Sequence, residues 1–489
     1  MFSYPPTLAF CIIATVGSVQ AIQTIVTNNL DDGTGSLRAA IAAATKGETI
    51  IFAPALDGTT ITLTSGQLII SGLEVTIDAS SLPSGLSISG NNASRVLAIT
   101  GTSNVTLRSL TIRGGSAINQ NGGGVFVADG NVQMLDCNVR ECFASYNGGG
   151  VSLGFGVTAT LERCRIVGNT SSNLGFGGGL FVGGASYTLI RNCAVSGNSN
   201  PLGGGIAVSN SSPLIRNCTI QGNSGGGMYC FSSSTPHIEN TIVWGNNHTS
   251  GTPAARQLKS TNGSLPVLSY SLVEGASGAA SFGAQNPVTW GSGNLDGSVP
   301  SGDPKFVKAI NSSNSPHSGG DLRLLATSPT LNAGNNLANP GSLDAAGSPR
   351  IQDTIVDLGA YEGGFTSFAL LYPTLAPGGD ENHNGIQNLE EYGMGYDPNS
   401  AWNDFPSQTF SNDGTDTFLA INQRSNAFDL SIFVQTSTSL DDSWVELSEG
   451  IHYTAVISTP VSSNRIQQKF SLIAGDPKRF YRQGFVIKP

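Results

Sequence analysis

The sharpest chemical pattern in the sequence is the segment DENHNGIQNLEE, which spans residues 380–391. It matches the spacing D-x-[DN]-x-[DN]-G-x5-E, which places oxygen ligands around a tight turn. Calcium prefers such ligands, and the glycine at the sixth position permits the turn. The ligands that the pattern predicts are Asp380, Asn382, Asn384, the Ile386 carbonyl, Asn388 and Glu391, with Gly385 at the turn. Because only two of them are charged, we expect weak calcium binding, in roughly the millimolar range; the alternative is a polar linker.

Charged residues recur at a second place that could do chemistry, a bend that precedes the same position of a repeating unit. They are Arg108, Asp136, Glu162, Arg163, Arg191, Arg216 and Glu239. Stacked arginines could serve a polysaccharide lyase as base and as partners of a uronate, and paired acids could serve a glycosidase. The alternative, which we favour, is a solvated ladder of ion pairs that each contribute little. The weak catalytic candidates are Glu162, Arg163, Arg191, Arg216 and Glu239.

Aromatic residues recur at an outward position of the same units. Phe126, Phe181 and Tyr229 each stand shortly after a run of glycines, in a column that also holds Ser152 and Ala207. Aromatic rings in such a column could stack on sugar rings. Scattered exposed aromatic residues are equally ordinary, so both interpretations stay open.

Cysteines occupy a third repeated position. Six of the seven lie within one stretch of the chain: Cys137, Cys142, Cys164, Cys193, Cys218 and Cys230. Cysteines stacked on neighbouring coils fall within disulfide range, but parallel neighbours in register are poorly oriented for bonding. Buried free thiols that pack as small hydrophobic groups are the interpretation that we favour, and the disulfide state stays open.

A phrase that recurs five times reveals the elements that position these residues: NGGGVFV, NGGGVSL, FGGGLFV, LGGGIAV and SGGGMYC. The triplets begin at Gly122, Gly148, Gly177, Gly203 and Gly225, so the steps between them are 26, 29, 26 and 22 residues. Such a period indicates a repeat architecture. Ordered glycine costs backbone entropy, so the triplets predict sharp turns at which a Cβ would collide with neighbouring backbone, and not phosphate cradles.

Each unit also contains three short runs of alternating apolar residues, which predict three strands with one buried face. Short strands with no helix between them, at a period near 25 residues, predict a parallel β-helix whose coils stack at about 4.8 Å. Asparagines should then form a column at one turn, where asparagine tolerates the left-handed conformation. The members of this column are Asn169, Asn198, Asn223 and Asn246, with Cys142 in the first unit.

The stretch SLRAAIAAATKG predicts an amphipathic helix, with Leu37, Ile41 and Ala44 on one face. The open end of a parallel β-helix would recruit other strands. We therefore expect this helix to cap that end.

Several motifs in combination resemble bacterial surface proteins with right-handed parallel β-helices, of the choice-of-anchor class. They are DDGTGSLRAAIAAA, GETIIFAP, ITLTSGQLII, LSISGNNASRVLAI and the glycine-rich coils, and SPTLNAGNN with SPRIQDTIVDLGAYE resembles the segment that closes such helices. The resemblance covers roughly Ile22 to Glu362. Two departures are Gly35, where that opening motif commonly has cysteine, and Cys142 in place of a turn asparagine.

The remaining chain predicts a linker and a small second domain. Residues 365–379 are rich in proline and glycine, and the segment 380–400 resembles bacterial repeats of the thrombospondin type 3 kind more than a helix-flanked EF-hand. Strand-like runs about ten residues apart, FLAINQR to RFYRQGFVI, predict a β-sandwich over residues 401–489. The motifs SLDDSW and KRFYR resemble accessory domains that end many secreted bacterial proteins.

Composition bounds the partners. The chain has 489 residues, 39% hydrophobic and 11% charged, with a net charge of -10. This charge would repel phosphate backbones and anionic membranes, so we expect no nucleic acid partner. An apolar run from Thr7, followed by Val19-Gln20-Ala21, predicts a signal peptide over residues 1–21, although no Lys or Arg precedes it. No later stretch is long enough to span a membrane.

Together these features predict an all-β chain. Its parts are a parallel β-helix over residues 22–364, with a cap over 22–47 and a closing segment over 300–364, followed by the linker, the calcium loop and the sandwich. The function that we expect is that of an exported bacterial surface or matrix protein without catalysis, either in binding or adhesion, with a polysaccharide or a cell-surface component as partner, or in a structural role. The alternative is a lyase or glycoside hydrolase that acts on an extracellular acidic polysaccharide.

Overall fold

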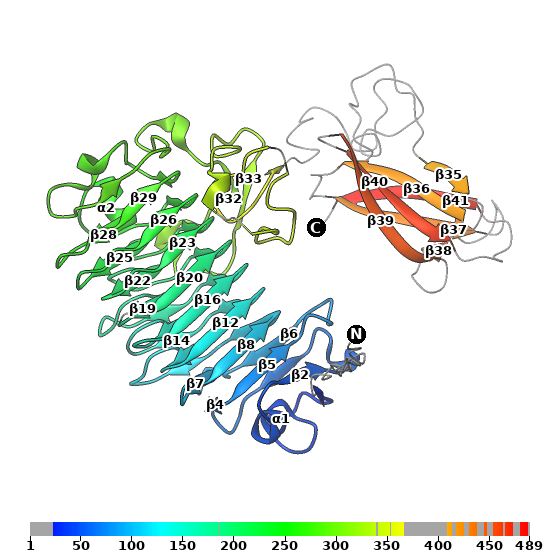
Figure 1. Ribbon diagram of the computed structural model, residues 1–489, viewed down its shortest axis with the longest axis horizontal. Helices are drawn as coiled ribbons and strands as arrows, with labels where there is room; N and C mark the ends of the chain where they lie inside the picture. Colours follow the sequence, from blue (N-terminus) through cyan, green and yellow to red (C-terminus); the bar gives the residue numbers. More distant parts are fainter. Residues whose placement is uncertain are drawn as a thin grey trace, which may run out of the picture.

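The computed structural model describes residues 23–184, 186–338, 341–352 and 354–365, and the backbone of seven strands between residues 408 and 487. The expected signal peptide, the linker beyond residue 365 and the calcium loop lie outside the described residues. The first described part is a stack of coils (Figure 1), in which each coil contributes one short strand to each of three parallel sheets.

Sheet 1 contains eleven strands within the described residues. They are β1 (Gln23–Val26), β2 (Glu48–Phe52), β5 (Glu74–Asp78), β8 (Asn104–Arg108), β12 (Asn131–Leu135), β16 (Thr158–Glu162), β20 (Tyr187–Arg191), β23 (Leu214–Arg216), β26 (His237–Glu239), β29 (Val267–Ser269) and β31 (Thr289–Trp290).

Sheet 2 contains nine strands of the described chain. They are β3 (Thr60–Thr62), β6 (Leu86–Ser89), β9 (Leu110–Arg113), β13 (Asn138–Arg140), β17 (Arg165–Val167), β21 (Ala194–Ser196), β24 (Thr219–Gln221), β27 (Ile242–Trp244) and β30 (Leu272–Val273).

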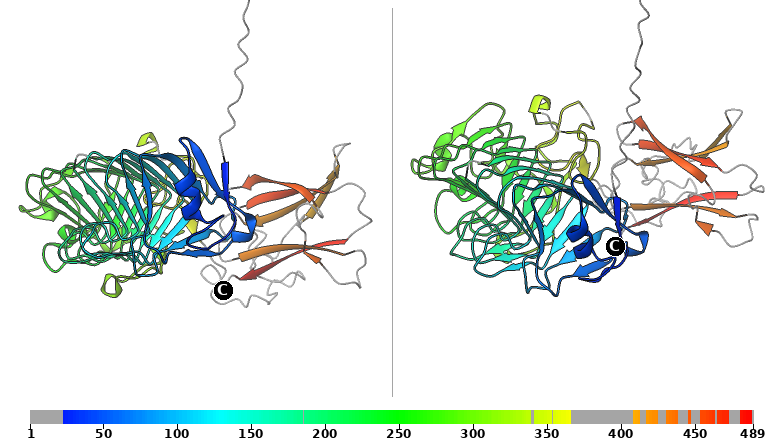
Figure 2. Two further views of the ribbon diagram at one scale, coloured as in Figure 1. Left: turned by 90° about the horizontal axis from the view of Figure 1, so that it is seen from below. Right: turned by 60° about the horizontal axis from the view of Figure 1, so that its bottom comes forward.

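Sheet 3 contains eight strands of the same part, and a short fourth ladder lies between sheets 2 and 3 in sequence. The strands of sheet 3 are β4 (Leu68–Ser71), β7 (Leu97–Thr100), β11 (Val125–Val127), β15 (Val151–Leu153), β19 (Leu180–Gly183), β22 (Ile206–Ser209), β25 (Met228–Phe231) and β28 (Leu258–Ser260). Those of the short ladder are β10 (Ser116–Ala117), β14 (Phe143–Ala144) and β18 (Thr170–Ser171). The three strands expected in each repeat are thus confirmed, and Figure 2 shows the stacked coils from two further sides.

The glycine triplets precede sheet 3 and are needed for close approach of backbone, as the sequence predicted. A Cβ on Gly204 would lie 2.0 Å from the carbonyl oxygen of Ser224 on the next coil, and one on Gly149 would lie 2.2 Å from that of Thr170. Neither contact involves a flexible side chain that could move away. Glycine at these positions is therefore dictated by the spacing of coils.

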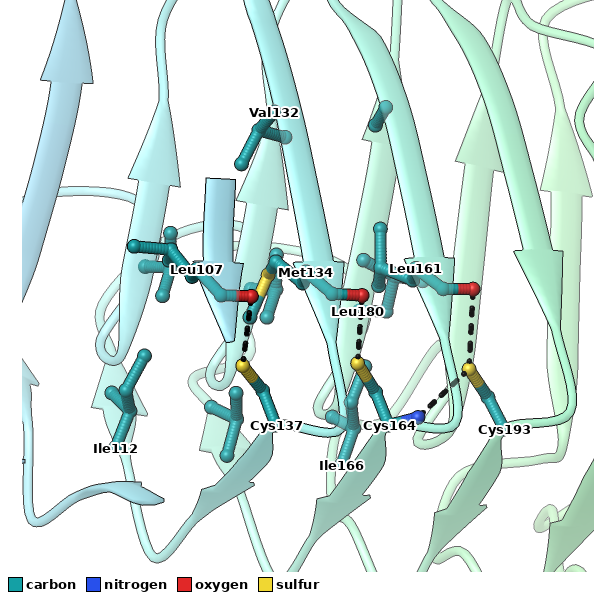
Figure 3. Packing of buried hydrophobic residues seen from close by; sticks show 14 of the residues in the cluster. Leu107, Ile112, Val132, Met134, Cys137, Leu161, Cys164, Ile166, Leu180 and Cys193 are labelled. Atoms are coloured by element: carbon teal, nitrogen blue, oxygen red, sulfur yellow. Dashed lines mark hydrogen bonds between the residues drawn. The ribbon is translucent and has the colours of Figure 1, made fainter. Parts of the chain in front are cut away.

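The cysteine column lies at the bend between sheets 1 and 2 and points into the core (Figure 3). The thiols of Cys164 and Cys193 donate to the carbonyls of Met134 and Leu161 on the preceding coil, at 3.2 and 3.4 Å. All six described cysteines are buried and free, which confirms the favoured interpretation. Burial raises the pKa of Cys230 to about 12, so this thiol stays protonated and is a poor nucleophile.

The asparagine column is confirmed, but its conformation differs from the expectation. The left-handed residue of each turn is the one before the asparagine, such as Gly197 with φ 60° before Asn198. The asparagines instead point inward and form a continuous ladder of buried hydrogen bonds. Asn198 Nδ2 donates to the Ile166 carbonyl at 2.9 Å, and its Oδ1 accepts the backbone N–H of Asn169 at 2.9 Å. The side chain therefore satisfies backbone groups that the turn leaves unpaired.

The predicted helix is α1 (Leu37–Ala43), which buries Leu37, Ala40 and Ile41 and packs on β1 and β4. Asp31 anchors the cap: it accepts hydrogen bonds from Ser65 and from Arg38, which also donates to the Gly66 carbonyl at 2.7 Å. Although burial opposes this, the hydrogen bonds hold the pKa of Asp31 well below its usual range. At the other end of the stack lie α2 (Pro253–Gln257) and the 3-10 helix η2 (Ala279–Phe282).

The closing segment, residues 300–364, lies along the side of the β-helix and not at its end (Figure 1). It contains β32 (Phe306–Lys308) and β33 (Asp321–Leu325), and β34 (Gly364–Phe365) pairs with β33. Its apolar residues cover the outward face of sheet 2 in a second core. The buried members of this core are Ala194, Ile242 and Leu272 from sheet 2, with Phe306, Leu322, Leu324, Leu358 and Ala360 from the closing segment.

The C-terminal strands form two antiparallel sheets. One has the order β35 (Gln408–Asn412), β36 (Thr417–Arg424), β40 (Arg465–Leu472) and β39 (Tyr453–Ser462). The other has the order β38 (Val445–Glu446), β37 (Leu430–Ser437) and β41 (Phe480–Ile487). The six strand-like runs of the sequence coincide with strands, and β35 is an addition. The boundaries drawn for this domain stay a prediction.

Candidate functional site

The charged residues at the bend after sheet 1 form three groups of ion pairs on successive coils, which together we call the charge ladder. Glu162 lies at its centre and pairs with Arg163 at 2.8 Å on its own coil and with Arg191 at 2.7 Å on the next. Arg163 also forms a two-pronged pair with Asp136, at 2.6 and 2.8 Å. Further along, Arg216 and Glu239 approach to 3.5 Å, and Arg108 lies 3.5 Å from Asp78. The carboxylates are therefore neutralised by neighbouring guanidinium groups.

The centre of the charge ladder is less solvated than the sequence suggested, whereas the side chains of Arg108 and Asp136 expose 40% and 38% of their area. The side chains of Glu162 and Arg191 expose only 13% and 17% of their area. The closing segment covers the ladder from outside: Asn335 Nδ2 donates to Glu239 at 3.0 Å, and Asn192 Nδ2 donates to the Leu343 carbonyl at 2.8 Å. Because the cover comes from residues far along the chain, the repeat pattern carried no sign of it.

Three aromatic rings meet on the outward face of sheet 3, and we call them the aromatic platform (Phe176, Tyr229 and Phe231). Tyr229 and Phe231 are stacked with ring centroids 4.9 Å apart and planes inclined by 19°. Phe176 lies 4.6 Å from Phe231 and 5.9 Å from Tyr229. All three rings are partly buried, so each keeps exposed area.

Small residues allow Phe176 to reach rings that belong to a coil two places further along. Ala207 stands between Phe181 and Tyr229 in the outward column, where a larger side chain would block the way. At Gly203 a Cβ would lie 2.9 Å from the Cβ of Tyr229. Lys259, next in the column, places its Nζ 5.9 Å from the Tyr229 ring, and Thr261 approaches the Tyr229 hydroxyl at 3.2 Å. The platform thus has a cation and a hydroxyl at its rim.

Of the three aromatic residues expected to contact sugar, only Tyr229 belongs to the platform. Phe126 stacks on the guanidinium of Arg95, at 4.9 Å from its centroid, and that guanidinium donates to the Gly122 carbonyl at 2.9 Å. Phe181 lies two coils from Tyr229 in the column. The sequence did signal Phe231, which follows Tyr229 at the strand period of two in MYCF, but no local pattern identified Phe176.

A buried polar cluster in the closing segment was missed entirely. Arg350 is fully buried, donates to the carbonyls of Asp357 and Gly359 at 2.9 and 2.7 Å, and lies 3.4 Å from Glu362. Burial raises the pKa of Glu362 to about 8, against the attraction of Arg350. These residues lie in the SPRIQDTIVDLGAYE stretch, and their contacts are made within the closing segment, so they brace its fold.

The predicted calcium ligands, Asp380 to Glu391, lie outside the described residues. Within the described ranges no group of three or more acidic, histidine or cysteine side chains is arranged to hold a metal ion. The helices described there are also too short and too polar to cross a membrane. The calcium site remains a prediction of the sequence.

The solved structures to which the chain is similar at low identity include the following three. Pectate lyase Pel9A aligns with a TM-score of 0.43 at 14% identity, over 71% of this chain and 97% of the lyase. Jun a 1, the major allergen from cedar pollen, aligns with a TM-score of 0.35 at 13% identity, over 61% of this chain and 84% of the allergen. The enzymatically active domain of tailspike protein 4 of bacteriophage CBA120 aligns with a TM-score of 0.30 at 11% identity, over 90% of this chain and 64% of the tailspike domain. We base no argument on likenesses at this level.

A search of curated protein sequences gives no match. A family model described as "Right handed beta helix region" matches residues 95–264. This range covers the coils from β7 to β28, in which the glycine, cysteine and asparagine columns repeat. The match and the three parallel sheets together show that the chain contains a right-handed parallel β-helix.

Proposed function

We propose that this protein binds carbohydrate through the aromatic platform and acts as a non-catalytic component of an extracellular surface or matrix. The single observation that carries the proposal is the meeting of Phe176, Tyr229 and Phe231, whose ring centroids lie 4.6–5.9 Å apart on one face. The apolar faces of sugar rings stack on aromatic surfaces of this kind. Tyr229 and Phe231 lie on one strand of sheet 3, β25, and Phe176 lies in the turn before β19, so the surface is preformed and binding costs little ordering.

The polar rim suits such a ligand. Lys259 lies beside Tyr229 and presents an ammonium donor, and Thr261 donates to the Tyr229 hydroxyl, whose own O–H is left to donate at the edge of the platform. Sugar hydroxyls would accept these hydrogen bonds while the ring stacks. An open aromatic surface with donors at its edge fits one face of a saccharide chain better than it fits a small molecule that must be enclosed.

The alternative is a polysaccharide lyase or glycoside hydrolase that uses the charge ladder. The observation in its favour is that Glu162 lies within 2.8 Å of both Arg163 on its own coil and Arg191 on the next. A lyase base must be deprotonated, however, and the hydrogen bonds that Arg163 donates to Asp136 raise the pKa of its guanidinium. We therefore prefer binding without catalysis.

Export and calcium binding belong to the same proposal and rest on the sequence alone. The apolar run that ends near Ala21 would direct export, and the loop of residues 380–391 would bind calcium at extracellular concentrations. A bacterial cell surface is the location that the resemblance of the sequence favours. The partner would be a polysaccharide or another cell-surface component.

A glycan array with the mature chain, followed by calorimetry with the best ligand, tests the proposal. Tyr229→Ala and Phe231→Ala should each weaken binding roughly tenfold or more, since stacked aromatic residues dominate such contacts. Tyr187, which is 85% exposed on sheet 1, supplies the matched control. Equal losses in Tyr187→Ala and Tyr229→Ala would contradict the assignment.

The question of catalysis needs a separate measurement. Polysaccharides that bind are incubated with the protein and analysed for unsaturated products and for new reducing ends. We expect neither. Turnover that disappears in Glu162→Gln but persists in Tyr229→Ala would establish the enzyme alternative.

A further inference from the structure

A pocket of about 360 Å³ lies between sheet 2 and the closing segment, on a different face from the aromatic platform. Its floor is formed by Ala194 and Ser196 of β21, and Gly319 and Gly320 of the closing segment stand opposite. Arg165 and Tyr361 also line it. The volume lies near the lower end of the range of about 300–1,000 Å³ that is usual for small-molecule sites.

The hollow follows from side-chain size at two register positions. In one outward column Ala194 stands between Arg165 and Thr219. In the other, Ser196 stands between Val167 and Gln221. Both small residues belong to one coil, so the sheet is indented there. The closing segment lies over this indentation with Gly319 and Gly320, whose lack of side chains leaves the space unfilled.

The pocket contains an arginine without an internal partner. Arg165 is exposed, and within the described residues its side chain makes no ion pair or hydrogen bond. The second guanidinium of the pocket differs, because Arg323 is held by Asp321 through its Nε at 2.9 Å. One positive charge is therefore left over at the pocket wall, even though the chain as a whole carries -10.

Tyr361 adds a hydroxyl on the side of the closing segment. Its ring packs against the second core, and Arg165, Arg323 and Asp321 lie close enough to affect its pKa. Burial raises that pKa, so the phenol stays protonated and can donate a hydrogen bond. Ser196 supplies a further hydroxyl on the floor. A guanidinium with two hydroxyl donors is the donor set that a carboxylate accepts.

We propose that this pocket, the arginine pocket, binds the carboxylate of an acidic sugar, with Arg165 as its counter-ion and Tyr361 as a hydrogen-bond donor. Leu322, Ala345 and Ala346 provide an apolar wall for the C–H side of the sugar ring. The assignment to a sugar rests on the proposed carbohydrate function, whereas the assignment to a carboxylate rests on the pocket itself. The protein would thus hold an acidic saccharide at a second place.

Titration calorimetry with galacturonate and glucuronate, and with galactose, glucose and sulfate, tests the proposal on the mature chain. We expect both uronates to bind and both neutral sugars to fail in this pocket. Arg165→Gln should weaken uronate binding roughly tenfold or more, since charge-assisted hydrogen bonds are the strong ones. Arg113→Gln is the matched control, because Arg113 lies on the same sheet two coils away and outside the pocket. Since Arg165 is exposed, Arg165→Gln should keep its melting temperature.

Tyr361→Phe removes only the hydroxyl and should weaken uronate binding by a smaller factor. Absence of uronate binding at about 10 mM, or equal losses in Arg165→Gln and Arg113→Gln, would overturn the proposal. Sulfate that binds as tightly as the uronates would overturn the assignment to a sugar. Tyr229→Ala should leave uronate binding at this pocket unchanged, so failure of the arginine pocket and failure of the aromatic platform can be told apart.

Discussion

Asn223 accepts two hydrogen bonds from Asn198 through its Oδ1, one from the backbone N–H at 2.9 Å and one from the side-chain amide at 3.0 Å. Asn246 Oδ1 likewise accepts the backbone N–H and the side-chain amide of Asn223, at 2.9 and 2.8 Å. The side-chain oxygen of Gln257 accepts the same two hydrogen bonds from Asn246. Each coil is therefore tied to the next by a side chain in the dry interior. These side chains supply hydrogen-bond acceptors for the backbone N–H groups that lie at the turns, outside the sheets.

Asn198→Ala should destabilise the β-helix by about 2–5 kcal/mol, because it removes the hydrogen-bond partner of the buried backbone N–H of Asn169 and of the Ile166 carbonyl. Urea unfolding followed by circular dichroism measures the change. The control is Asn131→Ala, an exposed asparagine in β12. Similar midpoints for the two variants would show that the asparagine ladder contributes no more than a surface residue.

Gly204→Ala should cost about 3 kcal/mol or more, because the added Cβ would lie 2.0 Å from the Ser224 carbonyl oxygen on the next coil. Gly204→Val should be worse, since it adds bulk to the same clash. Gly278→Ala serves as the control, because a Cβ there meets nothing within 4 Å and its φ is not left-handed. Differential scanning calorimetry compares the three, and an unchanged melting temperature in Gly204→Ala would remove the steric explanation of the triplets.

The closing segment should become less stable as pH rises. Burial raises the pKa of Glu362 from its ordinary 4.5 to about 8. Between these values the folded state holds a proton that the unfolded state releases, so the stabilisation is complete below about pH 4.5 and is lost as pH rises through about 8. We expect a loss on the order of 2–4 kcal/mol, measured as the pH dependence of hydrogen exchange in residues 341–362. Glu362→Gln should flatten this dependence. The control is Glu74→Gln, which should leave it unchanged because the Glu74 side chain is 45% exposed. A stability of the closing segment that rises between pH 5 and 8 would contradict the argument.

The loop of residues 380–391 should bind calcium in preference to magnesium. Glu391→Gln should weaken binding far more than Asn388→Ala, because position twelve of such loops supplies two oxygens and position nine often binds through water. Calorimetry of the mature chain with each ion measures this. An equal heat from magnesium, or none from about millimolar calcium, would leave a polar linker.

The sequence predicted those parts of the structure that repeat. Glycine triplets, cysteines and asparagines report contacts between a coil and its neighbour, and such contacts recur at the period of the coil. The closing segment carries no such period. Gln221 Nε2 donates to the Ile310 carbonyl at 2.8 Å across 89 positions in the chain, and nothing near either residue signals the other. For the same reason the sequence did not predict that Arg165 and Tyr361 line one pocket.

Contacts of the closing segment with the β-helix run from Glu141, which accepts a hydrogen bond from Ser318 at 2.8 Å, to Leu272 in the second core. A stack in which each coil touches only its neighbours can fray from either end, one coil at a time. A strap fixed to several coils at once opposes that, because an inner coil cannot peel away until the strap has left. We infer that a cut that releases the strap would allow the coils that it covers to fray one at a time from the end of the stack.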